Sequence, residues 1–126
     1  MANVNMKLTY NLQSEVCELD GYVGLDTSAA VVAASTVFPN ATVAKTTTGV
    51  YTITLANPFP KIVFVGAHWA ANAAASGLRC EVGPVTVGAT TSVVIRTTNA
   101  AGAATDTGVA GGFWVQIKVK NTSVVN

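Results

Sequence analysis

Charged side chains are scarce in this sequence. Only 10% of the 126 residues are Asp, Glu, Lys or Arg, whereas about 25% is usual in soluble domains. Protein interfaces are depleted in charge, because charged groups are costly to remove from water. We therefore favour a surface that is partly covered by copies of the chain or by a partner. The alternative is a neutral surface coated with Thr, Ser, Asn and Ala.

Positive charge is also sparse and scattered. The net charge is +1, and the seven basic residues form no run along the chain. Proteins that bind nucleic acid neutralise several phosphates at once, which requires a basic stripe or patch. We therefore expect no nucleic-acid partner. The basic residues are Lys7, Lys45, Lys61, Arg79, Arg96, Lys118 and Lys120.

Long apolar runs are missing as well. The longest strongly apolar stretches lie near residues 62–65 and 70–75 and are far shorter than the ~20 residues that a membrane-spanning helix needs. Residues 1–20 lack a basic start followed by an apolar run, so we expect no secretory signal. These features predict synthesis in a cytoplasm and no membrane partner.

Cysteine and histidine are too few for most metal sites. A structural zinc ion needs four ligands, but the chain has two cysteines, Cys17 and Cys80, and one histidine, His68. The cysteines are far apart and lack a CxxC spacing, so we expect buried free thiols rather than a disulfide. No metal site is expected.

Catalytic motifs are absent too. His68 would have to serve any Ser-His-Asp site, yet no Gly-x-Ser-x-Gly turn precedes a helix. The glycine-rich loops that bind nucleotides and the Asp-rich loops that bind calcium are also missing. We therefore expect no catalytic residue and no cofactor, and a protein that is not an enzyme.

Alternation of apolar and polar residues is what the sequence has in abundance. This period of two is typical of strands with one face on a core, and Val and Thr enrichment favours sheet throughout. The Ala-rich residues 67–75 are interpreted as a strand that runs into a loop. Strands are expected at residues 6–10, 15–23, 30–37, 41–45, 51–55, 62–70, 78–87, 92–98 and 113–119.

Turn residues such as Pro39-Asn40 and Thr48-Gly49 separate many of these segments. Short strands at regular spacing without helices predict an all-β fold, namely an antiparallel β-sandwich or jelly roll. The length fits a single domain over residues 1–126.

Large side chains on the last strand suggest an interface. The alternation places Trp114 and Gln116 on the outward face and Phe113 on the opposite one. Tryptophan is enriched where proteins meet, although both faces of this strand would also be covered if it lay inside one subunit. We expect one of the neighbours His68 and Trp69 to face the core and the other to face a surface. The interface candidates are Trp69, Phe113, Trp114, Gln116 and His68.

Two glycine-containing segments have alternative interpretations. Gly111-Gly112 predicts either a bend at the entry to the last strand or a close approach of a neighbouring subunit. Residues 99–111 form a long loop rich in Ala, Gly and Thr, which predicts either a mobile surface arm or a contact element.

The segment 45–55 (KTTTGVYTITL), followed by Asn57-Pro58-Phe59, has a family resemblance. Together with Ala103–Asp106 and the closing segment 115–123 (VQIKVKNTS), it resembles small tailed-phage virion proteins, which include capsid decoration, head-fibre and tail-fibre-like modules. The resemblance covers residues 40–123 and rests on a rhythm of strands and turns.

The resemblance implies a β-sandwich or jelly-roll module that forms homotrimers, carries no cofactor and binds a virion surface. The expected function is a capsid decoration or cement protein on the capsid exterior, which binds the major capsid protein lattice and stabilises the head. Residues 1–40 match less well, and in such proteins this part often anchors to the particle. The alternative is a receptor- or glycan-binding module of a phage fibre, which would use Trp69, Tyr22, Tyr51 or Trp114 as stacking surfaces.

Overall fold

The computed structural model describes residues 16–71, 78–106 and 111–120. Within these ranges the chain is all-β and has no helix, as the sequence predicts. The expected strand at residues 6–10 lies outside the described residues. The strands are β1 (Val16–Leu25), β2 (Ala41–Thr47), β3 (Val50–Leu55), β4 (Lys61–Ala71), β5 (Arg79–Thr86), β6 (Ser92–Thr98) and β7 (Gly111–Lys120).

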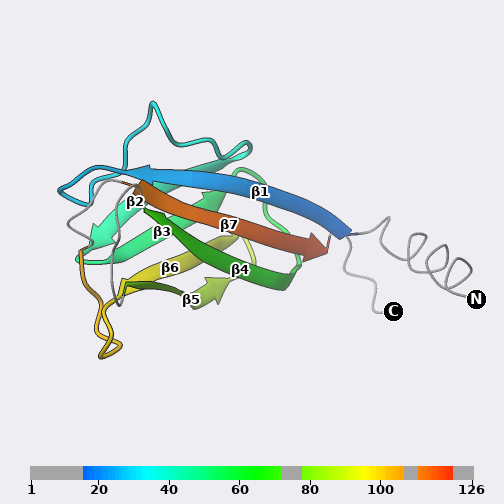
Figure 1. The fold of residues 1–126 in the computed structure, drawn as a ribbon. Helices are drawn as coiled ribbons and strands as arrows, with labels where there is room; N and C mark the ends of the chain where they lie inside the picture. The colour runs from blue at the N-terminus through cyan, green and yellow to red at the C-terminus, as the bar shows by residue number, and fades with distance from the viewer. Residues whose placement is uncertain (1–15, 72–77, 107–110, 121–126) are drawn as a thin grey trace, which may run out of the picture.

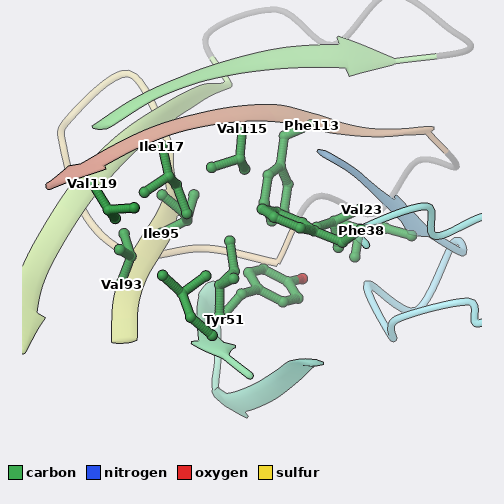
Figure 2. Close-up of a cluster of buried hydrophobic side chains, with 12 residues drawn as sticks. Val23, Phe38, Tyr51, Val93, Ile95, Phe113, Val115, Ile117 and Val119 are labelled. Atoms are coloured by element: carbon green, nitrogen blue, oxygen red, sulfur yellow. The ribbon is translucent and has the colours of Figure 1, made fainter. Parts of the chain in front are cut away.

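The strands form two antiparallel sheets that face each other in a sandwich-like arrangement (Figure 1). One sheet has three strands in the order β1-β7-β4, and the other has four in the order β2-β3-β6-β5. Side chains from both sheets meet in one hydrophobic core (Figure 2). The buried core residues are Val23, Leu25, Phe38, Tyr51, Ile53, Leu55, Val93, Ile95, Phe113, Val115, Ile117 and Val119.

The alternation in the sequence explains which side chains fill this core. In β7, four apolar residues from Phe113 to Val119 are buried, while the residues between them point to the outer face. Strand β3 follows the same rule, with Tyr51, Ile53 and Leu55 buried and threonines between them. Each fully buried side chain of this size stabilises the fold by roughly 1.5–3 kcal/mol.

The expected strand at residues 30–37 is wrong. Only Val31 and Val37 make isolated bridges, to Leu25 and Tyr22 of β1. Between them the chain turns, because the backbone N–H and the hydroxyl of Thr36 both donate to the Val32 carbonyl. Such local side-chain bonds compete with extended pairing.

Glycines in β1 allow this turning segment to lie close to the strand. A Cβ at Gly21 would lie 2.3 Å from the ring of Phe38, and one at Gly24 would lie 2.0 Å from the Ser35 hydroxyl. The segment therefore covers the free edge of β1.

Gly112 is also needed for a close approach, but within the chain. A Cβ there would lie 2.1 Å from the Val23 carbonyl oxygen and 2.7 Å from the Tyr22 ring. Tyr22 thus occupies the space over Gly112 on the outer face of the sheet. The glycine serves the pairing of β7 with β1.

The first part of the 99–111 loop is bound to the sheet rather than extended as an arm. The Asn99 side chain accepts hydrogen bonds from the backbone N–H groups of Ala101 and Ala103. Thr105 and Thr97 then bond to each other through backbone and side chain. Residues 107–110 lie outside the described part of the loop.

Asp106 joins this loop to the turn between β2 and β3. One carboxylate oxygen accepts from the Gly49 N–H at 2.8 Å, and the other lies 2.9 Å from Lys45 Nζ. Gly49 has a φ of 66°, and a Cβ there would lie 2.6 Å from the Thr105 nitrogen. The hydrogen bonds from Lys45 and Gly49 lower the pKa of the Asp106 carboxyl.

Replacing Asp106 with Ala removes both interactions. We expect the free energy of unfolding to fall by about 1 kcal/mol at neutral pH, because the carboxylate is partly exposed and water screens its charge. Urea unfolding of both proteins measures this difference. Glu81→Ala is the control and should cost less, since its exposed contact with Arg96 spans 3.8 Å.

The Asp106 contribution also depends on pH. Because its pKa is lower in the folded chain than in the unfolded chain, the unfolded chain binds the proton more readily as acid is added. The stabilisation is complete above the ordinary value of 3.8 and is lost as the pH falls through the folded value. A difference between the two proteins that persists in strong acid would contradict this assignment.

Candidate functional site

The outer face of the three-stranded sheet carries an exposed aromatic pair. Trp114 on β7 lies opposite Tyr22 on β1 and His68 on β4. The indole is 56% exposed, and its ring centroid lies 4.8 Å from that of Tyr22 at an interplanar angle of 54°. A tilted pair at this separation is a favourable aromatic contact, so Tyr22 holds the indole in place.

Polar groups lie beside this pair on the same face. The Gln116 side chain donates a hydrogen bond to the Glu18 carboxylate. Lys118 Nζ lies 6.0 Å from the centroid of the exposed Phe64 ring. The face therefore offers one aromatic platform with hydrogen-bonding groups next to it.

Trp69 and Phe113 lie on the inner face of the same sheet. Phe113 is 0% exposed and packs against Tyr51 with ring centroids 5.4 Å apart. Trp69 is half-buried and packs against the core, and its buried Nε1 has no acceptor among the described residues. The five interface candidates thus divide into Trp114, Gln116 and His68 outside and these two inside.

Tyr51 is unavailable for stacking on a sugar. It is fully buried, and its hydroxyl donates to the Ala29 carbonyl at 2.7 Å. Burial raises the pKa of Tyr51 to about 12. Its role is to hold the turn after β1 against the core.

One edge of the sandwich is not covered by any other described segment. Val82 and Val85 of β5 lie opposite Ile95 and Val93, so their side chains point toward the core layer. They are nevertheless 40% and 48% exposed, because the three-stranded sheet does not cover β5. We call this side the open flank, and its exposed apolar residues are Val63, Val82, Val85 and Val87.

Two irregularities shape the open flank. The register of β4 shifts between Ile62 and Phe64, which leaves Val63 exposed. The register of β5 shifts between Val82 and Val85, around Gly83-Pro84. Proline lacks an N–H, so it interrupts the pairing capacity of an edge strand. Contact with another chain at β5 would therefore use side chains more than added strands.

Sequence reasoning missed this flank. Residues 62–65 are four consecutive apolar residues, and a strand with a period of two cannot turn all of them toward one core. That run was the available signal. The position of β5 at the edge was not readable from the sequence, although Pro84 is typical of edge strands.

An apolar groove lies at the other edge of the sandwich, between the segment after β1 and strand β2. It has a volume of about 310 Å³. Beside it, Val37 is 66% exposed. The groove is lined by Val31, Ala33, Thr36, Phe38, Ala41, Thr42 and Val43.

Metal-binding side chains and thiols are the remaining reactive groups among the described residues. No group of three or more metal-binding side chains occurs in the described ranges. Cys17 and Cys80 are free and half-buried, and burial raises the pKa of the Cys80 thiol to about 12. A thiol of this kind stays protonated and is a poor nucleophile. No helix in the described part is long and apolar enough to span a membrane.

Comparisons with models of known protein families, with curated proteins and with solved structures give no match for this chain.

Replacing each tryptophan with Ala should separate the two roles. Trp69→Ala is expected to lower the free energy of unfolding by about 3 kcal/mol, because it leaves a void beside the core. Trp114→Ala should cost about 1 kcal/mol, which is the worth of the Tyr22 contact. Thermal or urea unfolding measures both. Equal losses would contradict the assignment of Trp114 to an exposed platform.

Proposed function

We propose that this protein is a non-enzymatic structural protein that assembles with copies of itself into a homotrimer. In its specific form, the trimer is a bacteriophage capsid decoration or cement protein. It lies on the capsid exterior, binds the major capsid protein lattice and stabilises the head.

The observation that carries this proposal is the open flank. Val82 and Val85 point toward the core layer but remain in contact with water, and Val63 on β4 and Val87 after β5 are exposed as well. Contiguous exposed apolar patches on soluble proteins mark interaction sites. A second chain that covers the flank completes the core and removes the exposed edges of β4 and β5.

The strand order shares one feature with a jelly roll. Strands β1 and β7, the first and last in the described chain, pair with each other, and β3 pairs with β6 in the other sheet. These two pairs are nested as in a jelly roll, whereas the pairs β2–β3 and β5–β6 are hairpins of consecutive strands, which other β-sandwiches also have. The segments that resemble the phage proteins contain β3 and most of β7, so they supply one strand to each of the two nested pairs. They also contain Asp106, which joins its loop to the turn before β3.

The low charge supports a decorating role. A protein that coats a repeating lattice needs no catalytic group, because many weak contacts add up through multivalency. Its surface is covered by copies and by the particle, which accounts for the 10% charge content.

The proposal predicts an oligomer that binds phage heads. Light scattering or native mass spectrometry should give three times the chain mass of 12.8 kDa. Purified protein added to undecorated heads should pellet with them, and bovine serum albumin serves as the non-binding control. A monomer at all concentrations, or failure to pellet, would count against the proposal.

A receptor- or glycan-binding module of a phage head or tail fibre is the second candidate. The exposed indole of Trp114, held by Tyr22 beside Gln116, favours it, because sugar rings stack on exposed aromatic faces. A glycan array should then show binding that Trp114→Ala abolishes. The matched variant Phe64→Ala, at another exposed ring on the same face, should retain it. A flat array for the wild-type protein would reject this candidate.

A further inference from the structure

The open flank and the apolar groove lie on opposite edges of the sandwich. Strands β1 and β4 are the two edges of one sheet, and β2 and β5 are the two edges of the other. Since β4 and β5 contact each other (Figure 1), β1 and β2 must share the other edge. The groove between residues 31–38 and β2 lies on that edge. Each chain therefore carries one exposed apolar surface at the β4–β5 edge of the sandwich and one at the β1–β2 edge.

Charge is divided between the same two edges. Glu18 and Asp20 are exposed on β1, whereas Lys61 is exposed on β4 and Arg79 on β5. No ion pair within the described residues engages Asp20, Lys61 or Arg79.

The remaining described pairs do not alter this division. Glu81 lies near Arg96 on the same sheet, and Asp106 is bound to Lys45. Counting only the exposed charges outside these ion pairs, the β1 side carries two acids and the β4–β5 side carries two bases, and we call them the acidic and the basic edge. Lys118 of β7 lies opposite Glu18 in the register, so Asp20 is the acid without a basic neighbour in the register.

We propose that the open flank of one copy packs against the groove edge of the next copy, head to tail. The valines of β5 and the exposed residues of β4 then lie against Val37 and the groove beside it. Lys61 and Arg79 approach Glu18 and Asp20 of the neighbour. This inference rests on the proposed self-association and specifies the surfaces that form it.

A head-to-tail contact fits the two edges better than a symmetric one. An interface of the open flank with itself would bring two basic edges together, and like charges in contact oppose association. It would also end at a dimer and leave both grooves uncovered. A contact between two different surfaces forms a closed ring when the rotation between copies permits it. A ring of three copies gives the proposed homotrimer.

Two variants, each with one of the two contact surfaces disrupted, test this arrangement. Val85→Glu places a negative charge on the open flank, where it faces the acidic edge of the neighbour. Val37→Lys places a positive charge beside the groove, where it faces the basic edge. Each variant alone should be a monomer by light scattering. Thr52→Glu, on the outer face of the central strand β3, is the matched control and should remain a trimer.

Mixing the two variants is the decisive step. Each retains one intact face, so an equimolar mixture should form one-to-one heterodimers and no larger species. If Val37→Lys alone keeps the wild-type mass, or if the mixture stays monomeric, the head-to-tail contact is wrong. If the wild-type protein is itself a monomer, the proposed function is wrong. If the wild-type protein is a trimer but the variants or their mixture behave otherwise than expected, only the head-to-tail contact is wrong.

A folding control accompanies these measurements. Val85 and Val37 are both substantially exposed, so each variant should retain the wild-type circular dichroism spectrum. Should either fail to fold, Lys61→Glu and Asp20→Lys replace them, since they change the same two edges at exposed charged positions. The expected outcomes for these replacements are the same.

Discussion

The three-stranded sheet is one strand narrower than the four-stranded sheet against which it packs. The sheet formed by β1, β7 and β4 leaves Val82 and Val85, on the inward face of β5, in contact with water, and the exposed apolar edge of the molecule follows from this difference in width. On the β1 side the segment after the strand covers the free edge, through the bridge between Tyr22 and Val37 and the contact of Phe38 with Gly21. On the β4–β5 side no described segment does so.

This asymmetry connects the composition to the proposed function. A chain with so few charges has few solvated groups to surround an apolar edge, and exposed apolar patches of this kind mark interaction sites. Outside the ion pairs, exposed acids lie on β1 and exposed bases lie on β4 and β5, and the proposed contact between copies uses this division. In the proposed contact, hydrophobic burial supplies the affinity and charge selects the orientation.

The sequence predicted the central strands well because each has one face on the core. Strands β3 and β7 follow a strict period of two, and Thr between apolar residues leaves no ambiguity about which side is buried. The all-β class and the outward direction of Trp114 follow from the same rule.

Other features depend on tertiary contacts that periodicity does not encode. The segment 30–37 has the composition of a strand but turns, because Thr36 bonds to Val32 and to Gly24. The link between Asp106 and Gly49 joins residues far apart in the chain. The sequence alone did not separate the five interface candidates into buried and exposed ones. The strand register and the exposures do so, because they place Phe113 in the core and Trp114 on the outer face. The open flank itself depends on strand order, which no local pattern specifies.

Amide hydrogen exchange at two protein concentrations tests the central claim most directly. If copies of the chain cover the open flank, the amides of β4 and β5 exchange slowly at high concentration and faster on dilution below the assembly threshold. The amides of β3, inside the sheet, should be unaffected. Exchange of β4 and β5 at the same rate at every concentration would contradict the claim that other copies complete the core.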